Sequence, residues 1–365
     1  MNFIHKGKQF NIERYPHTDN KSLKAWNAGD EYVLKYLSEK NISDKSLVVS
    51  NDKFGFLSTI LSSELATSIV DYKSQEKAFI KNFEANEIDI NTVKIVSPLS
   101  ELSDRIDFGL IKIPKSTDLF RLYLNQIHKH LSSEGEVICS FMTKNFNKTI
   151  LNIANEFFES VEQSLAWKKS RLLMLKNKKE IKDQSLLNVI TYNSEKDFKQ
   201  YLGVFSAKNI DYASQYFINY ISINDGDNKL LDLASGNGVL GYDLRSKCKD
   251  CELHLVDDSF LAVESSKLNL ENENTHFHHS DSLGIFENDY FDLVVSNPPF
   301  HFEFENNIEI SLELFKGVHR VLKNNGRFQL VANLHLNYRV HLEKIFSSVE
   351  ILGELDKFVV YECVK

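Results

Sequence analysis

The stretch 291–301 joins a short apolar run to side chains that can position a reactive nitrogen. The run 293–295, Leu-Val-Val, is typical of a buried strand in a parallel sheet. It ends at Asn297, Pro298 and Pro299, and two prolines cannot continue a central strand because proline lacks the N–H and has a fixed φ. The chain therefore leaves the predicted sheet at its carboxyl edge, where open α/β sheets bind ligands.

The residues at this exit suit methylation of a planar NH2 group, whose nitrogen is a weak nucleophile because its lone pair is delocalised. The Asn297 side-chain oxygen and the Pro298 carbonyl would each accept one of its hydrogens, and Phe300 would stack on the base beside the charge developing on nitrogen. Asn297-Pro298-Pro299-Phe300 resembles the signature of amino-directed S-adenosylmethionine (SAM) methyltransferases. The alternative is an Asn-Pro turn after a strand.

A second candidate site runs from Asp232 to Gly238, at a predicted strand-to-helix turn. Glycines there let the backbone approach a ligand, and a helix N-terminus presents free N–H groups. The spacing does not match a full dinucleotide fingerprint, so we do not expect phosphate binding. The turn resembles the SAM-binding loop, with Asp232, Ala234, Gly236 and Gly238 as cofactor residues; the alternative is an ordinary βα turn.

Two acidic residues follow the next two predicted strands. Asp257 is placed like the acid that holds a ribose diol in related nucleotide folds, and Asp281 resembles the acid that accepts from the adenine amino group. Either alone is more often a helix cap. The ordered set of turn, two acids and Asn-Pro-Pro-Phe is much rarer, and it places Asn297 beside the cofactor as well as the substrate.

The strands and helices that would position these residues occur twice along the chain. Five matched pairs are separated by 183, 186, 185, 184 and 191 residues: Leu47 and Leu230, Asp71 and Asp257, Asp107 and Asp292, Pro114 and Pro298, Gly135 and Gly326. Such a constant spacing indicates duplication of one βα domain. We therefore predict an α/β fold with two tandem Rossmann-like methyltransferase domains, the second ending in an antiparallel hairpin. The first copy lacks the glycine turn and the Asn-Pro-Pro-Phe exit, so we expect it to be degenerate.

The predicted boundaries are 1–175 for the degenerate domain, 176–195 for a polar linker and 196–365 for the catalytic domain. The chain has 365 residues and a net charge of −8. Residues 1–190 hold 27 Lys+Arg against 24 Asp+Glu, a balance of +3, which leaves 16 against 27, or −11, for the rest. This asymmetry favours contact between the first domain and RNA.

A basic patch at Lys168, Lys169 and Arg171 lies near the end of the positive part, and we predict that it binds RNA. The alternative is a solvated face. No apolar run approaches the ~18 residues of a membrane span, and four cysteines do not make a disulfide framework, so we expect a reducing cytosolic compartment. We predict no metal site. We expect the Cys-x-x-Cys pair, Cys248 and Cys251, to be structural, and likewise the clustered histidines His276, His278 and His279. His301 would either line the base pocket or face solvent.

Taken together, the chain resembles the large-subunit ribosomal RNA guanine-N2 methyltransferases, a sister group of the small-subunit enzymes. The resemblance rests on short blocks around Trp167, Gly238, Asp257 and Asn297, and on Val331-Ala332-Asn333 and Lys357-Phe358-Val359-Val360. It implies a degenerate first domain, a SAM domain and one guanine of 23S rRNA as target. The expected partner is protein-free or early-assembly 23S rRNA, with the enzyme a monomer that does not bind membranes.

Two departures from the family pattern concern the cofactor site. The family usually has Gly-Cys-Gly in the turn, where this chain has Ala234-Ser235-Gly236, and we expect alanine to fit only with negative φ. The family also carries an arginine near Gln215. The alternative activities are methylation of 16S rRNA guanine N2, of adenine N6 or of a protein glutamine. A different class of function is a catalytically silent RNA-binding module.

Overall fold

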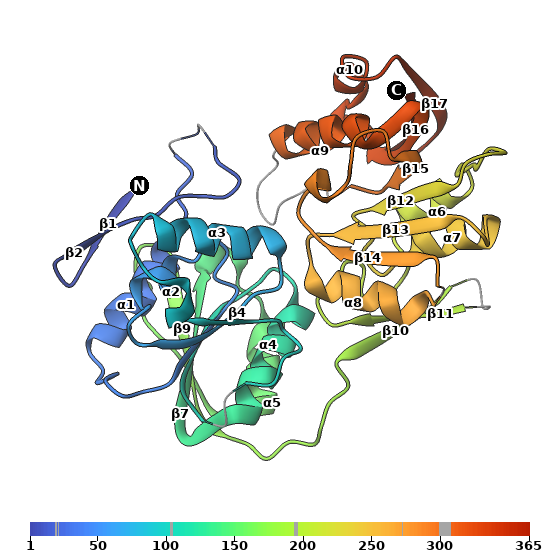
Figure 1. Cartoon of the computed structure of the whole chain (residues 1–365). Helices are drawn as coiled ribbons and strands as arrows, with labels where there is room; N and C mark the ends of the chain where they lie inside the picture. Colours follow the sequence, from blue (N-terminus) through green and yellow to red (C-terminus); the bar gives the residue numbers. More distant parts are fainter. Residues whose placement is uncertain (19, 21, 103–104, 193–195, 272, 299–307) are drawn as a thin grey trace. The chain divides into compact units, whose positions relative to one another are not determined.

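The computed structural model describes residues 1–365 except 19, 21, 103–104, 193–195, 272 and 299–307 (Figure 1). The chain divides into two compact units, Met1–Ser185 and Leu186–Lys365. Each unit contains a seven-stranded sheet and a separate two-stranded hairpin. This confirms the predicted duplication of an α/β domain.

The first unit has the strand order β5-β4-β3-β6-β7-β9-β8. The first five of these strands are parallel, and β9 runs antiparallel to both of its neighbours. Helices α1, α2 and α3 pack against one face of the sheet through a shared apolar cluster. The elements are β1 (Asn2–His5), β2 (Lys8–Asn11), α1 (Ala28–Ser38), β3 (Leu47–Ser50), α2 (Phe56–Ile60), β4 (Leu65–Ile69), α3 (Lys73–Glu84), β5 (Lys94–Val96), β6 (Ile106–Lys112), α4 (Thr117–His130), β7 (Leu131–Met142), α5 (Lys148–Phe157), β8 (Phe158–Gln163) and β9 (Ser170–Lys178).

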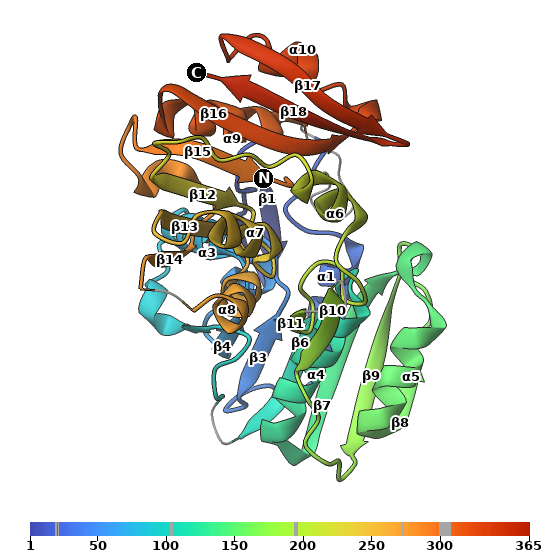
Figure 2. The ribbon, with the colours of Figure 1, turned by 90° about the vertical axis from the view of Figure 1, so that its right-hand side faces the viewer.

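The second unit repeats this topology in the order β14-β13-β12-β15-β16-β18-β17, and Figure 2 shows its last four strands side by side. The predicted terminal hairpin is β17–β18, and it extends the main sheet because β18 also pairs with β16. The elements are β10 (Leu187–Tyr192), β11 (Lys196–Tyr201), α6 (Tyr212–Ile218), β12 (Lys229–Leu233), α7 (Val239–Lys247), β13 (Glu252–Asp257), α8 (Phe260–Asn269), β14 (Thr275–His279), β15 (Phe291–Ser296), α9 (Ile308–Val321), β16 (Leu322–Asn333), α10 (Arg339–Leu342), β17 (Ser348–Leu355) and β18 (Phe358–Val364).

The central strands of the second unit are buried on both faces, which explains their continuous apolar sequences. Leu230 and Leu293 pack into the cluster that contains α6 and α7 residues. The adjacent residues Leu231 and Val294 pack into the opposite cluster, with α9 and α10. Successive side chains of a strand point to opposite faces, so an uninterrupted apolar run is the pattern that a covered sheet requires.

Matched residues of the two copies make the same contacts. Asp107 accepts a hydrogen bond from the backbone N–H of Ser46, just before β3, at 3.1 Å. Asp292 accepts from the N–H of Asn228 and of Lys229, at the start of β12, at 3.0 and 2.9 Å. Strands β7 and β16 have the same length, 12 residues, and the same sequence of buried and exposed positions. The repeat therefore extends from topology to individual side chains.

The predicted linker range contains regular structure. Strand β9 continues to Lys178 and β10 begins at Leu187, so among the described residues of this range, 176–192, only 179–186 lies outside strands and helices. The strands β10 and β11 pair with each other rather than with the main sheet. The linker prediction depended on the polar composition of 176–185, which lies before β10. The hairpin that follows has exposed and partly exposed positions on both strands.

Candidate functional site

The residues predicted to bind cofactor and substrate lie at one edge of the second sheet. Strands β14, β13, β12 and β15 are adjacent and parallel, so their carboxyl ends meet at the same edge. Asp281 follows β14, Asp257 ends β13, the turn 234–238 follows β12, and Asn297 follows β15. The topology thus brings the four sequence motifs together, as expected for a ligand site at a parallel sheet edge.

The turn after β12 contains three left-handed residues. The φ angles are +60° at Ala234, +56° at Gly236 and +81° at Gly238, the residue before α7. The expectation of a negative φ at Ala234 is therefore wrong: alanine adopts the conformation that the family's glycine would take, at a cost of about 1–2 kcal/mol. A Cβ at Gly238 would lie 3.0 Å from Leu270, whereas one at Gly236 would meet no atom within 4 Å, so the turn is open at Gly236.

Asp257 joins this turn to the second strand. One carboxylate oxygen accepts from the Gly236 N–H at 2.9 Å and the other from the Ser259 N–H at 2.9 Å. Burial raises the pKa of Asp257 to about 6, although these hydrogen bonds oppose the rise. The neighbouring Ser280 N–H donates to the Asp257 carbonyl at 3.0 Å, which holds the partly exposed Asp281 next to the end of β13. The two acids expected to contact ribose and adenine are therefore neighbours.

Asp232 is fully buried beneath the turn. Its Oδ2 accepts from the N–H of Gly241 in α7 at 2.8 Å, and burial raises its pKa to about 7. Its Oδ1 is buried and has no hydrogen-bond partner among the described residues. Asp232 therefore supports the first turn of α7 and keeps one acceptor unused.

Asn297 is held by the N-cap residue and a first-turn residue of α6, neither of which the sequence motifs included. Its Nδ2 donates to Asp211 Oδ2 at 3.0 Å and to Ser214 Oγ at 2.9 Å. Asp211 is the N-cap of α6 and also accepts from the Ser214 N–H at 3.2 Å. The remaining side-chain oxygen, Asn297 Oδ1, is buried and has no partner among the described residues. The amide is thus oriented with its acceptor unused.

A sequence signal for these two residues existed, because an aspartate before an apolar helical turn is an N-cap pattern. The pattern gave no indication that the cap would also contact Asn297, 86 residues later. Gln215, where the family has an arginine nearby, donates to the Ile210 carbonyl at 2.6 Å and closes the start of the same helix.

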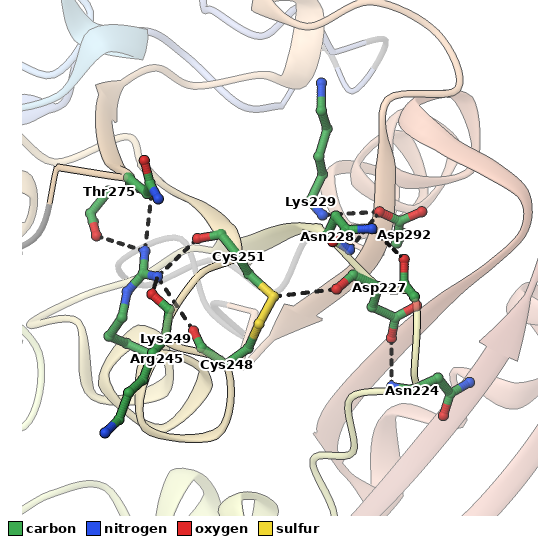
Figure 3. Close-up of a disulfide and its surroundings, with 12 residues drawn as sticks. Asn224, Asp227, Asn228, Lys229, Arg245, Cys248, Lys249, Cys251, Thr275 and Asp292 are labelled. Atoms are coloured by element: carbon green, nitrogen blue, oxygen red, sulfur yellow. Dashed lines mark hydrogen bonds between the residues drawn. A yellow bond between two sulfur atoms is a disulfide. The ribbon is translucent and has the colours of Figure 1, made fainter.

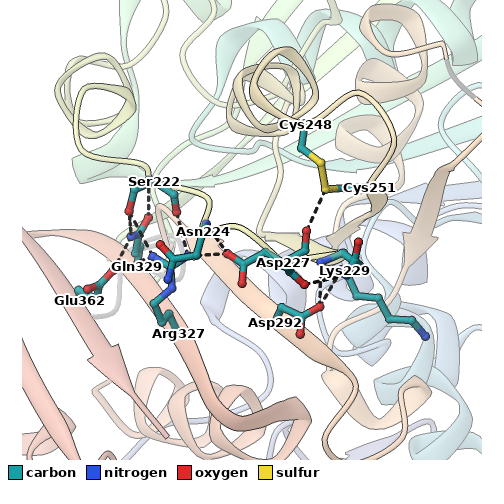
Figure 4. Close-up of polar contacts among 12 residues, drawn as sticks. Ser222, Asn224, Asp227, Lys229, Cys248, Cys251, Asp292, Arg327, Gln329 and Glu362 are labelled. Atoms are coloured by element: carbon teal, nitrogen blue, oxygen red, sulfur yellow. Dashed lines mark hydrogen bonds and ion pairs between the residues drawn. A yellow bond between two sulfur atoms is a disulfide. The ribbon is translucent and has the colours of Figure 1, made fainter.

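A polar network fixes the segment that follows α6 (Figure 4). Arg327 of β16 donates to Asp227 Oδ2 at 2.6 Å and to Glu362 Oε2 of β18 at 3.2 Å. Gln329 Nε2 donates to Glu362 Oε2 at 2.6 Å and to Ser222 Oγ at 3.0 Å. Both β16 side chains are buried, so this network ties the end of α6 to the sheet that carries Asn297.

The loop between α7 and β13 contains a disulfide between Cys248 and Cys251 (Figure 3). The sequence predicted no disulfide framework and a structural role for this pair, and the cysteine count did not indicate that these two thiols, three residues apart, would bond. Arg245 spans the same loop and donates to the carbonyls of Lys249 and Cys251 at 2.8 Å each, and to Thr275 Oγ1 at 3.0 Å. Both the disulfide and the Arg245 hydrogen bonds therefore stabilise this loop.

The predicted aromatic contact lies outside the described residues, as do Pro299, Phe300 and His301. Pro298 is described and is buried. The chemistry that can be derived at this exit therefore rests on Asn297, Pro298 and the two α6 residues.

The basic patch lies at the turn before β9. Lys168 Nζ is 2.9 Å from Glu31 Oε2 and 4.4 Å from the centre of the Trp167 ring. Lys169 is exposed, and the partly buried Arg171 donates to Gln163 at 3.2 Å. Part of the positive charge is therefore neutralised within the unit, while Lys168 and Lys169 are both exposed.

The first copy has an ion pair where the second has the Asn297 contacts. The sheet registers pair Ser50 with Ile111 and Leu233 with Ser296, so Lys112 takes the position of Asn297, one residue before the position that the Pro114–Pro298 match indicates. Lys112 Nζ lies 2.8 Å from Asp30 Oδ2 in α1. The position that orients an amide in one copy thus carries a paired cation in the other.

The site's polar groups fit SAM. SAM carries an ammonium group, a ribose diol and an adenine amine, all of which are hydrogen-bond donors. Asp232 Oδ1 and Asn297 Oδ1 are buried acceptors without partners among the described residues, and the turn at Gly236 is open. Buried polar groups normally have partners, so unused acceptors beside an open turn indicate a donor-bearing ligand. No helix in the described part of the chain is long and apolar enough to cross a membrane.

Comparisons with known proteins agree with this geometry. Residues 1–179 match the RLMG N-terminal domain, and residues 195–362 match the methyltransferase small domain. One solved structure is that of a T. thermophilus 16S rRNA N2 G1207 methyltransferase in complex with AdoMet and guanosine. Its sequence is 20% identical to this chain and the TM-score is 0.80; the match covers 100% of this chain and 97% of the T. thermophilus chain. It shares the fold of this protein.

Two curated relatives have the same name, and each is similar to this chain over nearly its whole length. Ribosomal RNA large subunit methyltransferase G of Pseudoalteromonas translucida is 32% identical, covering 98% of this chain and 96% of that protein. Its namesake from Psychromonas ingrahamii is 28% identical, covering 97% of this chain and 96% of the relative. The two domain matches and these full-length likenesses lead to one conclusion: the chain belongs to the family of ribosomal RNA large subunit methyltransferases G.

Proposed function

We propose that this protein transfers the methyl group of SAM to the N2 amine of one guanine in 23S rRNA. Membership of its family makes it a SAM-dependent rRNA methyltransferase. The observation that carries the choice of an amine is the orientation of Asn297, whose Nδ2 is engaged by Asp211 and Ser214 while Oδ1 remains a buried acceptor.

Asn297 would select the reacting group by its fixed polarity. Rotating the amide by half a turn would place Oδ1 against the Asp211 carboxylate, and this repulsion keeps the acceptor toward the substrate. A base that presents NH2 donates to Oδ1, whereas one that presents a carbonyl meets a second acceptor. The Pro298 carbonyl would accept the other hydrogen, so the nitrogen lone pair points away from both acceptors.

SAM, when bound, supplies an electrophilic methyl group on a sulfonium. The chain's own residues would then do three things: Asp257 and Asp281 hold the nucleoside part, the turn around Gly236 accommodates the methionine part, and Asn297 orients the amine. Asn297 donates no proton and forms no bond to carbon. The amine loses one proton to solvent after the new N–C bond forms, and the reaction needs neither a metal nor a covalent enzyme intermediate.

The first unit would position the RNA. It has the seven-stranded topology of the second, but Lys53 stands in its turn and Lys112 in its Asn297 position. Phosphate contacts fix the register of a nucleic acid before a base is flipped, and the first 190 residues carry +3 against −11 for the rest. We therefore propose Lys168, Lys169 and Arg171 as RNA contacts, and a cytoplasmic monomer that acts on protein-free or early-assembly 23S rRNA.

The activity is tested by methyl transfer from labelled SAM to protein-free 23S and 16S rRNA, followed by digestion and mass mapping of the product nucleoside. We expect one N2-methylguanosine in 23S rRNA. N6-methyladenosine, or a product confined to 16S rRNA, would replace the substrate assignment. Absence of transfer with intact SAM binding would favour the silent RNA-binding module.

A second experiment addresses the first unit. Replacing Lys168, Lys169 and Arg171 together by Ser should weaken rRNA binding and lower its salt dependence, because fewer counterions are released, while SAM affinity stays the same. The matched control replaces Lys6, Lys94 and Lys115, which lie elsewhere on the first unit, by Ser. Equal effects of the two triple variants would mean that net charge, rather than this patch, guides the RNA.

A further inference from the structure

A cluster of chemically active side chains lies on strands β13 and β14. Glu252, His254 and His276 are in the first halves of these strands, whereas Asp257 lies at the end of β13. Glu252 and His254 are two residues apart on β13, and His276 and His278 are two residues apart on β14. The parallel register sets His254 opposite His276. Alternate residues of a strand share a face, so all four side chains lie on one face of the sheet edge.

Three of these residues present ligand atoms to a common point. His254 Nε2 is 2.9 Å from Glu252 Oε1, and His276 Nε2 is 4.0 Å from the same oxygen. The ligand atoms of the three residues all lie within 4.8 Å of one another. Two ligands on a tetrahedral zinc, with bonds of about 2.0–2.1 Å, lie about 3.4 Å apart, so the two observed separations fall on either side of that value.

His278 orients the buried member of the set. Its Nε2 lies 2.9 Å from His254 Nδ1, so the other ring nitrogen of His254 is directed toward Glu252. A hydrogen bond to the second nitrogen is the usual way in which proteins fix a metal-binding histidine. The rings of Phe286 and Tyr290 pack edge-on against His254, at centroid distances of 5.3 and 5.7 Å. His254 is therefore held between two hydrogen-bond partners and packed against aromatic rings.

A hydrogen-bonded chain alone explains only part of this arrangement. The Tyr290 hydroxyl donates to Glu252 Oε1 at 2.8 Å, and His254 and His278 complete a satisfied chain without any ion. His276 has no place in that chain, because 4.0 Å is too long for a hydrogen bond. The His276 side chain is 46% exposed, against 7% for that of His254. It would instead supply a third ligand from the solvent side, from which a metal ion could enter.

We propose that Glu252, His254 and His276 bind a divalent transition-metal ion, with water as the fourth ligand. Two imidazoles and one carboxylate are a donor set typical of zinc, and the imidazoles also suit cobalt and nickel. Lys229, whose Nζ is 3.7 Å from Glu252 Oε2, neutralises the oxygen that the ion does not use. The bound ion fastens the edge strand β14 to β13 and takes no part in methyl transfer, because the candidate site is at the other ends of these strands.

Titration of the tag-free, chelator-treated full chain with Co²⁺ tests the proposal. We expect saturable binding of one equivalent, with the visible absorption of a four-coordinate ion and without the charge-transfer band that a thiolate ligand adds. His276→Asn changes an exposed side chain and should weaken binding at least about tenfold, the lower end of the effect of losing even an outer-shell partner. Glu252→Gln should act in the same direction.

The matched control is His130→Asn in the first unit. His130 Nε2 lies 3.2 Å from Glu101 Oε2, a histidine–carboxylate pair of similar separation that belongs to no group of three possible metal ligands among the described residues. It should bind Co²⁺ like the parent, and Zn²⁺ should raise the unfolding temperature of the parent and this control but not of His276→Asn. Equal affinity of parent and His276→Asn, no saturable binding, or a thiolate band from Cys248 and Cys251 would overturn the proposal.

Discussion

Asp211 should control turnover through the orientation of Asn297, and Asp211→Ser tests this directly. Serine still caps α6, since Ser and Asp are both preferred N-caps, but its side chain is too short to reach Asn297 Nδ2. The hydrogen bond that is lost has a charged acceptor and contributes about 1.5–3 kcal/mol. If that energy acts only on amide orientation in the transition state, the rate of methyl transfer should fall about 13- to 160-fold, since 1.36 kcal/mol is tenfold.

Ser214→Ala should have a smaller effect of the same kind. The hydrogen bond from Asn297 Nδ2 to Ser214 Oγ is neutral and contributes about 0.5–1.5 kcal/mol, which corresponds to a fall of about 2- to 13-fold. Asn297→Ala removes the acceptor itself and should lower the rate by about 10²–10³. The three variants therefore form an ordered series whose order follows from the contacts.

The assay is single-turnover methyl transfer at saturating SAM and RNA, with SAM affinity measured separately by calorimetry. The matched control is Asn27→Ser, which changes the N-cap of α1, the equivalent helix of the first copy, and should leave the rate unchanged. In the Asn297→Ala background, Asp211→Ser should have little further effect, because both act on one group. Additive losses, or a loss of SAM affinity equal to the loss of rate, would refute the positioning role.

Three further predictions follow from the described contacts. Ala234→Gly should increase the free energy of unfolding by about 1 kcal/mol in urea denaturation, because φ is +60° there, whereas Ala154→Gly, within α5, should decrease it. Because burial raises the pKa of Asp257 to about 6 and a ribose diol requires the ionised acceptor, the ratio of parent to Asp257→Asn affinity for SAM, measured by calorimetry, should be nearly constant above pH 7 and about tenfold smaller at about pH 5. Asp232, whose pKa burial raises to about 7, is present in both proteins, so its titration does not enter this ratio. Arg245→Met should lower the free energy of unfolding by about 1–3 kcal/mol, because it leaves the part-buried Cys251 carbonyl without its donor while water replaces Arg245 at the exposed Lys249 and Asn274 carbonyls. Cys248→Ser with Cys251→Ser should cost no more than about 2 kcal/mol because the closed loop is short, and a larger cost would contradict this.

The sequence was sufficient to predict the sheet and the edge at which the site lies. Apolar runs such as 293–295 identified buried strands, and because parallel strands share a carboxyl edge, Asp257, Asp281 and Asn297 had to be neighbours. These inferences depend on periodicity and on strand direction, both of which are local or topological properties. They hold without knowledge of any side-chain contact.

The details that decide the chemistry could not be predicted in this way. Whether an N-cap side chain also reaches a residue 86 positions away depends on how α6 packs on the sheet, which no local pattern specifies. The positive φ of Ala234 is imposed by the surrounding turn against the preference of alanine. The proposed metal-ligand set could not be assembled from the sequence, because Glu252 and His276 become neighbours only through the register of β13 and β14.

The ion pair between Lys112 and Asp30 bears on the history of the duplicated chain. Asp30 is 1% exposed, so changing Lys112 to Asn would leave a buried carboxylate without its cation, a change that typically costs 3–5 kcal/mol. Restoring an amine-binding asparagine in the first copy would therefore require a compensating change at Asp30 in the same step, together with a glycine in place of Lys53. Changing Lys112 alone or Asp30 alone would break the buried ion pair, and the less stable protein would have gained no activity on which selection could act. The buried ion pair thus opposes the return of an amine-binding asparagine to the first copy. It places no such constraint on the surface of that copy, which can still change.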